Sequence, residues 1–184
     1  RSGSAADPTD LPGLAGFTSS MLDEGTATRS ALQSADEVHA LGAALRTGAQ
    51  TDGSSANVRS LKQTSARALA VLSDVVLRPA FPEKEIDRIR NDRLTALMQQ
   101  RDQPWPTASR VMNACLFGPT HPYGHVSLGT EEALKKISRS DLVRFYETNL
   151  NPKNTALIMV GDITEAEARK LATDAFGSWK GADV

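Results

Sequence analysis

Cysteine and histidine are scarce in this 184-residue sequence, which contains one cysteine, Cys115, and three histidines, His39, His121 and His125. A single cysteine excludes a disulfide within the chain. One cysteine and three histidines also leave no Cys/His zinc-finger framework. Cys115 lies within an apolar helical pattern and is expected to be a small buried side chain.

Long hydrophobic runs and an excess of charge of one sign are also missing. The longest apolar runs, such as 68–72 and 156–160, fall well short of the roughly 18 residues needed to cross a bilayer. Lys and Arg number 21 against 22 Asp and Glu, and this near-neutral balance argues against a general nucleic-acid binder or an electrostatically held membrane protein. No glycine-rich phosphate loop or dinucleotide fingerprint is present, so nucleotide binding is not expected.

The composition is that of an ordinary globular protein. Hydrophobic residues make up 40% of the sequence and charged residues 23%, which excludes wholesale disorder and a fibrous repeat. A chain of this length fits one domain, and residues 1–184 are interpreted as a single domain. Because the sequence starts at Arg1 without an initiator methionine or a signal peptide, it is expected to be a piece of something longer.

Apolar periodicity and capping residues predict a mainly helical chain. Ser34 with Glu37, Ser138 with Asp141, and Thr164 with Glu167 are expected to cap three of the helices. The predicted helices cover 11–24, 34–41, 64–78, 82–100, 105–117, 138–150 and the segment from 164 onward.

Strands are predicted at two places. The dipeptide Asp52-Gly53 favours a type I′ turn, so residues 44–61 are expected to form an antiparallel hairpin. The apolar run 155–160 has the length of a strand and is bounded by Pro152 and Gly161. Helices and strands in this order describe a two-layer α+β domain, in which helices cover one face of a mainly antiparallel sheet.

Residues that could carry chemistry are few. His121 and His125 are four residues apart, but Pro122 and Gly124 break the helix that would aim both imidazoles at one metal ion. A structural role in the loop is therefore favoured for these two, and His39, on a short polar helix, is expected at the surface. Ser19 and Ser20 lack a G-x-S-x-G elbow, which argues against a serine nucleophile.

A family resemblance extends along nearly the whole chain. Residues 13–26 read GLAGFTSSMLDEGT and resemble the helix of the M16 (pitrilysin-like, processing-peptidase-like) metallopeptidases, where G-L-A-H-x-x-E-H-M-L-x-x-G-T is typical. The likeness continues in order through 41–45, 74–79, 81–83, 121–124, 129–130, 141–142, 145–146, 152–154, 160–162 and 176–179. The resemblance implies the M16/LuxS-like metallohydrolase fold, with one or two further N-terminal strands that this chain does not hold.

The departures from the family motif decide what the resemblance implies about function. In H-x-x-E-H two histidines bind zinc and the glutamate acts as general base on the metal-bound water. Those three positions are Gly16, Ser19 and Ser20, and the position of the family's third ligand, a glutamate on a later helix, is Ala96. Glycine and alanine have no donor atom and serine is a poor zinc ligand, so no metal ligand, general base or cofactor is expected in this chain.

The resemblance also implies a peptide-binding edge strand. In catalytic relatives the corresponding strand pairs with the substrate backbone through its unpaired edge amides. Arg46 replaces a residue that is usually asparagine, and Gly48 and Ala49 are weak strand formers, all of which count against pairing. The candidate peptide-binding residues are Leu45, Arg46, Thr47, Gly48, Ala49 and Gln50.

Three functions remain open. The first is a non-catalytic domain that forms a chamber wall and supports peptide binding, while a catalytic M16 unit, in the same polypeptide or a separate subunit, holds zinc. The second is a divergent peptidase that binds metal through His39, His121 or His125. The third is a purely structural subunit. Relatives of this type are often exported, so the resemblance favours an extracytoplasmic (periplasmic) location.

Overall fold

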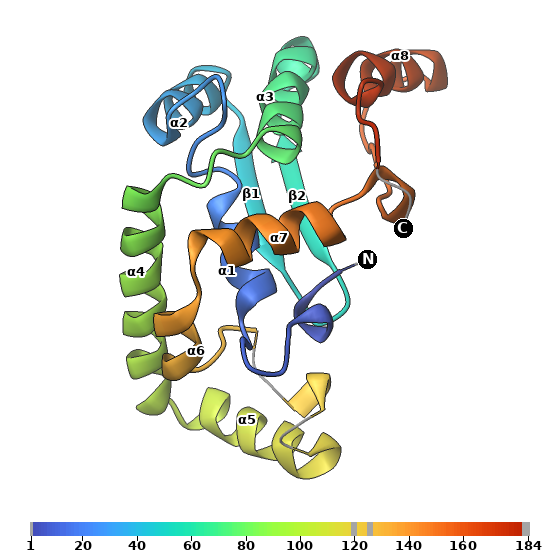
Figure 1. Cartoon of the computed structure of the whole chain (residues 1–184). Coiled ribbons are helices and arrows are strands. Elements are labelled where there is room, and N and C mark those ends of the chain that lie inside the picture. The colour runs from blue at the N-terminus through green and yellow to red at the C-terminus, as the bar shows by residue number, and fades with distance from the viewer. Residues whose placement is uncertain (1, 119–120, 125–126, 182–184) are drawn as a thin grey trace.

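The computed structural model describes residues 2–118, 121–124 and 127–181, which form an α+β structure (Figure 1). Its helices and strands are α1 (Leu14–Met21), α2 (Ala31–Ala40), β1 (Ala44–Ala49), β2 (Ser54–Arg59), α3 (Ser65–Leu77), α4 (Glu83–Arg101), α5 (Pro104–Phe117), α6 (Glu131–Lys136), α7 (Arg139–Asn149) and α8 (Glu165–Phe176). Single 3₁₀ turns lie at Ser4–Ala6, Lys62–Thr64, Pro122–Gly124 and Pro152–Asn154. No helix in the described part of the chain is long and apolar enough to cross a membrane.

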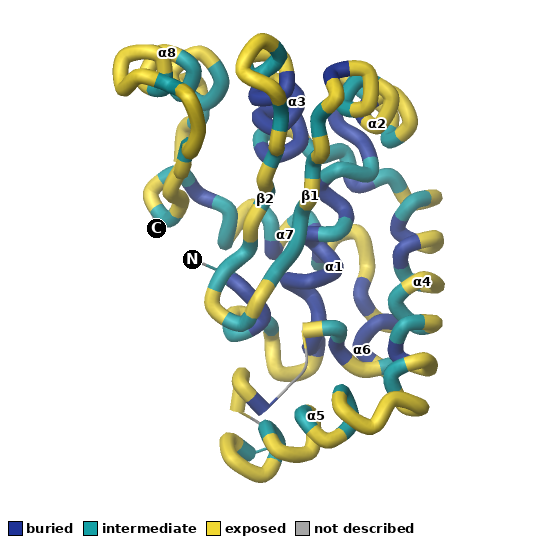
Figure 2. Tube along the Cα trace, turned by 180° about the vertical axis from the view of Figure 1, so that it is seen from behind, coloured by how far each residue is buried: buried dark blue, intermediate teal, exposed yellow. Residues whose placement is uncertain are grey.

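Helix α1 is the centre of the molecule. It packs against α7, α4 and the β1–β2 hairpin, and Figure 2 shows it as the most continuously buried element. Phe17 and Met21 are fully buried, and Leu142 of α7 and Ile86 of α4 belong to the same core cluster. A helix surrounded in this way must be apolar or small on every side, which explains why seven of its eight residues are buried.

A second, smaller cluster lies under α3. Leu69, Leu72 and Val76 of this helix pack against Val58 of β2 and against Phe176 of α8. Helix α8 contributes no fully buried residue, so it is attached to the rest of the structure by one partly buried face.

The predicted hairpin is confirmed, but its turn is not of type I′. β1 and β2 are antiparallel with Ala44 opposite Arg59 and Ala49 opposite Ser54. A type I′ turn needs positive φ at both central residues, and no residue between the strands has it. The backbone N–H of Gln50 donates to the carbonyl of Gly53 instead, closing a longer loop.

The prediction of a strand at 155–160 is wrong. These residues make no strand ladder, and within the described residues the sheet contains β1 and β2 alone. Ile158 is 81% exposed and Val160 94% exposed, while Met159 packs against the cluster under α3. A strand is defined by hydrogen bonds to a neighbouring edge, and no described strand pairs with this segment, so β propensity alone does not produce one.

Several helix boundaries also differ from the prediction. Helix α2 begins after Ser30, whose capping box is completed by Gln33, rather than after Ser34, because glutamine closes such a box as well as glutamate does. Helix α6, capped by Thr130, was not predicted. The caps at Ser138 and Thr164 are confirmed.

The prediction of a buried Cys115 is wrong. It lies on α5 and is exposed, as are Trp105 and Leu116 of the same helix. Helix α5 has no buried residue. Phe117 contacts the rings of His121 and Tyr123 but stays 45% exposed, so these contacts cover the apolar side chains of α5 only in part. The apolar pattern was present, but packing determines whether such a pattern is buried.

Candidate functional site

The site predicted by the zinc-motif resemblance begins at the N-terminus of α1. The carboxylate of Asp7 accepts hydrogen bonds from the backbone N–H groups of Gly13 and Ala15, both at 2.7 Å, and so caps the helix. Gly13 has a φ of 95°, and a side chain on Gly129 would meet the carbonyl oxygen of Pro12 at 2.3 Å. These glycines allow the loop at 127–130 to lie directly against the start of α1.

Of the four positions that correspond to the zinc ligands and the base, three lie on α1 and one lies on α4, which packs against α1. Gly16 and Ser19 are buried on α1, Ser20 lies at its margin, and Ala96 lies half-buried on α4. The hydroxyl of Ser20 donates to the carbonyl oxygen of Gly16 at 3.0 Å. The sequence does not show which side chain lies between α1 and α4 beside these positions.

Arg93 of α4 occupies this region. One guanidinium nitrogen, Nη1, lies 3.3 Å from the hydroxyl of Ser20, and Nη2 donates to the carbonyl oxygens of Ser127 at 3.1 Å and Leu128 at 3.4 Å. A Cβ atom on Gly16 would lie 2.7 Å from Nη2 and 2.6 Å from the carbonyl oxygen of Ser127. Both distances are shorter than a van der Waals contact, so no histidine fits at Gly16 in this arrangement.

The guanidinium of Arg93 is held in an environment with little water. Burial lowers the pKa of Arg93 to about 10, and the negative charge of Asp7 opposes that shift. The guanidinium carbons of Arg93 and Arg90 each lie 5.7 Å from the centre of the Phe17 ring, within the range of a cation–π contact. Arg93 remains a cation at neutral pH, because its lowered pKa is still well above 7.

A zinc site does not fit the residues in this region. The motif positions present a glycine, two serines and an alanine, and the space between them holds a cation that would repel a second one. Across the described residues, no group of three or more His, Cys, Asp or Glu side chains is arranged to hold a metal ion. His39 and His121 are both exposed, and His125 lies outside the described residues.

Most of the candidate peptide-binding residues lie on a strand, and their binding of peptides stays a prediction. Leu45, Arg46, Thr47, Gly48 and Ala49 belong to β1, whereas Gln50 lies just beyond it. The carbonyl oxygen of Gln50 accepts from the N–H of Ser4 and is already used within the fold. In the described structure β1 pairs with β2 on one side, and no strand pairs with its other edge.

One side chain of β1 is tied to the helix behind it. The hydroxyl of Thr47 donates to the carboxylate of Asp23 at 3.0 Å, just after α1. Burial raises the pKa of Asp23 above its ordinary value, although the hydrogen bond from Thr47 acts in the opposite direction. Arg46 is exposed on the opposite face of the strand, and beyond Gly48 there is open space.

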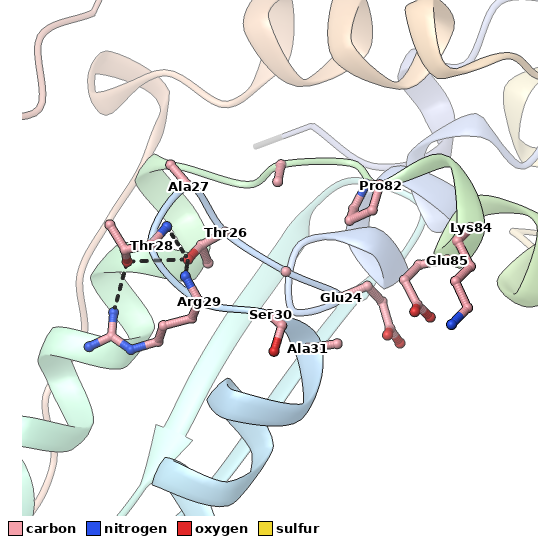
Figure 3. A pocket seen from close by; sticks show the side chains of 12 residues that line it. Glu24, Thr26, Ala27, Thr28, Arg29, Ser30, Ala31, Pro82, Lys84 and Glu85 are labelled. Carbon is pink, nitrogen blue, oxygen red and sulfur yellow. Dashed lines mark hydrogen bonds between the residues drawn. The ribbon is translucent and has the colours of Figure 1, made fainter.

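A surface pocket of about 420 Å³ lies beside the loop after α1 (Figure 3). Figure 3 shows Glu24, Lys84 and Glu85 at one end and the hydrogen-bonded group Thr26, Thr28 and Arg29 at the other. Glu24 and Glu85 both form ion pairs with Arg88. Counting Arg88 and Lys84 with the two glutamates leaves no net charge at this end of the pocket, so the pocket has no concentrated charge that would select a ligand.

Asp74 is a buried acid. It lies in one of the stretches that resemble the family, but the sequence alone gave it no role. Its side chain is fully buried, and one oxygen accepts hydrogen bonds from Thr26 at 2.6 Å, Thr28 at 2.7 Å and Arg29 at 2.7 Å. The other oxygen lies 2.7 Å from a guanidinium nitrogen of Arg78. Burial acts to raise the pKa of Asp74, but these partners outweigh it and hold the pKa below its ordinary value.

Arg93 was also missed by sequence reasoning. The available signal was its spacing: it lies one turn before Ala96 on α4, so both residues face the same side of the helix. A charged residue on the inner face of a helix that packs against the motif helix suggests a buried partner. Finding that partner requires the fold, because Ser20 is 73 residues away in the sequence.

A motif helix packed on a long second helix and a hairpin is the architecture of a metallopeptidase homologue, here with a glycine, two serines and an alanine at the motif positions. The chain belongs to peptidase family M16. The family model described as insulinase (peptidase family M16) matches residues 1–116, and the model described as peptidase M16 inactive domain matches residues 136–183.

Individual relatives agree with this assignment. The chain is 25% identical over 176 residues to an uncharacterized zinc protease of Mycobacterium leprae, covering 96% of this chain and 39% of that protein. It is 25% identical over 161 residues to a non-peptidase homolog of Helicobacter pylori, covering 88% of this chain and 37% of that protein. The chain thus spans about 40% of the length of these curated relatives.

A solved structure shows the same fold. The crystal structure of a peptidase M16 inactive domain from Pseudomonas fluorescens superimposes with a TM-score of 0.87 at 30% sequence identity, over 99% of this chain and 44% of that one. The M16-type α+β fold implied by the sequence is thereby confirmed.

Proposed function

We propose that this chain is a non-catalytic domain of an M16-type peptidase assembly, which forms part of the chamber wall and supports peptide binding for a catalytic partner unit. The observation that carries the proposal is the replaced metal position, where the guanidinium of Arg93 lies against Gly16 and Ser20 and where alanine, Ala96, stands at the position of the third ligand. Without a metal ion or a general base at this position, the chain has no means of activating water there.

In this proposal the catalytic partner supplies zinc and the chemistry of hydrolysis. The partner is an M16 unit, either in the same polypeptide or in a separate subunit. The M. leprae relative, whose name describes a zinc protease, supports a link to peptide hydrolysis, while the H. pylori relative, named as a non-peptidase homolog, supports the non-catalytic role.

We also propose that residues 1–184 act as one domain, although two family models match separate parts of the chain. The support is a shared core. Phe17 and Ile86 from the first part lie in one cluster with Leu142 and Phe145 from the second. Side chains that share one core unfold together in small domains, so the two parts are expected to depend on each other.

A metal assay separates this proposal from a divergent metallopeptidase. We expect protein purified without chelator to carry no stoichiometric zinc and to leave unstructured peptides uncleaved. The same measurements on a variant with His39, His121 and His125 replaced by Ala act as the control. Stoichiometric zinc in the wild type that disappears in this variant would establish the alternative function.

Peptide binding tests the role of β1. A proline at Ala49 removes a backbone N–H and rigidifies the strand, so A49P is expected to weaken the binding of short unstructured peptides to the intact protein by about tenfold. The matched control is A49V, which keeps the N–H and has higher β propensity, and it should bind at least as well as wild type. Fluorescence anisotropy with labelled peptides measures both. Absence of peptide binding in the wild type would instead favour a purely structural subunit.

A further inference from the structure

Arg93 connects three separate parts of the chain through one planar group. It extends from α4, reaches the hydroxyl of Ser20 on α1, and reaches the carbonyl oxygens of Ser127 and Leu128 in the loop before α6. A metal ion between the same elements would connect them in a similar way, because it too binds oxygen or nitrogen atoms from several directions.

The neighbouring residues are shaped to accept this guanidinium. Gly16 has no side chain, and any Cβ at that position would overlap with Nη2 and with the carbonyl oxygen of Ser127. Phe17 presents its ring to the cation at 5.7 Å. The Nε atom of Arg93 is buried and makes no hydrogen bond within the described structure. The cost of removing this atom from water is offset by the hydrogen bonds of the two outer nitrogens.

We infer that Arg93 is a built-in structural cation, which takes the place between α1 and α4 where the family motif would put a metal ion and which holds α1, α4 and the loop at 127–128 together. The inference goes beyond the proposed function, because it explains how the fold remains closed without metal. It does not depend on whether the protein binds peptides or has a catalytic partner, and its test uses neither activity.

Cavity formation and chemical rescue test this inference in the 184-residue chain. R93A removes the cation and leaves a space, so its thermal midpoint is expected to fall by about 5–10 °C. Adding ethylguanidinium at millimolar concentration should raise the midpoint of R93A by several degrees, because the free cation can fill the space between Phe17 and Ser20. Ethylurea, which is similar in size but uncharged, should not do so.

The matched control is R67A. Arg67 is exposed on α3, so its removal should leave the midpoint within about 1 °C of wild type and create no response to ethylguanidinium. R93K is measured in parallel in case R93A does not fold. A lysine keeps the charge but cannot reach Ser20 and both carbonyl oxygens with one planar fork, so it should lose several degrees.

Three outcomes would overturn the inference. These are an R93A midpoint equal to that of R67A, an R93K midpoint equal to that of wild type, and equal responses of R93A to ethylguanidinium and ethylurea. A loss in R93A that ethylguanidinium alone restores supports it.

Discussion

At the residue scale, the motif positions matter through the space they leave as well as through the donors they lack. A histidine at position 16 or 20 would occupy the volume that Arg93 fills. Gly16 accepts the guanidinium because it has no Cβ, and Ser20 accepts it because a hydroxyl is small and polar. The residues that replace the metal ligands are small, and the arginine side chain packs in the space that they leave.

Asp74 shows a second way in which a single residue holds distant segments together. Its buried carboxylate joins α3 to the loop at 26–29 through two hydroxyl groups and the guanidinium of Arg29. Hydrogen bonds to a charged acceptor are stronger than neutral ones, and leaving their donors unpaired is costly. We expect this network to fix the chain direction after α1.

Replacing Asp74 with Asn is expected to lower the free energy of unfolding by about 2–3 kcal/mol at pH 7. Because the folded pKa of Asp74 lies below its ordinary value, the ionised carboxylate stabilises the fold at pH values above that ordinary value of about 4, and this stabilisation is lost as the pH falls through the folded pKa. Urea unfolding of wild type and D74N from pH 7 to pH 2.5 measures the difference. The gap between the two should narrow below about pH 4, and a gap that stays constant would show that the charge is not responsible.

At the scale of elements, α7 is positioned by the side chains it buries against α1. Leu142 is fully buried and Phe145 nearly so, and the capping box at Ser138 fixes where the helix begins. Helix α7 therefore combines a local start signal with an apolar face, which is why the sequence predicted it well.

Truncating Leu142 to Ala is expected to lower the free energy of unfolding by about 2–4 kcal/mol, because it leaves a cavity between α7 and α1. V160A is the control: it also shortens an aliphatic side chain, but Val160 is 94% exposed, so its effect should stay within about 0.5 kcal/mol. Chemical denaturation measures both variants. Similar losses for the two would mean that α7 is not part of the cooperative core.

The segment 155–160 shows the limit of reasoning from one element. Its composition favours a strand, and Pro152 and Gly161 limit it to the length of a strand. Strand formation also requires hydrogen bonds to a neighbouring strand, and neither β1 nor β2 pairs with this segment. In contrast, β1 and β2 are adjacent in sequence, so each strand has the other as its pairing partner.

At the scale of the whole molecule, the fold has a centre of buried helices and a periphery of more exposed ones (Figure 2). Helices α1 and α3 carry most of the fully buried side chains, whereas α5 and α8 carry none. The region around Arg93 belongs to the buried centre, because Arg93 is a residue of α4 and its guanidinium contacts α1. This location makes the replaced metal position part of the stability of the fold.

The sequence by itself determined the helices that begin at Ser138 and Thr164, the hairpin, the family, and the residue types at positions 16, 19, 20 and 96. Each of these depends on residues that are close in the chain or on the chemistry of a single side chain. Only the tertiary structure decided that Arg93 lies at the motif helix, that Asp74 ties α3 to the loop at 26–29, and that 155–160 pairs with no described strand. These features depend on contacts between residues far apart in sequence, as Ser20 and Arg93 are, and such contacts exist only once the helices have packed.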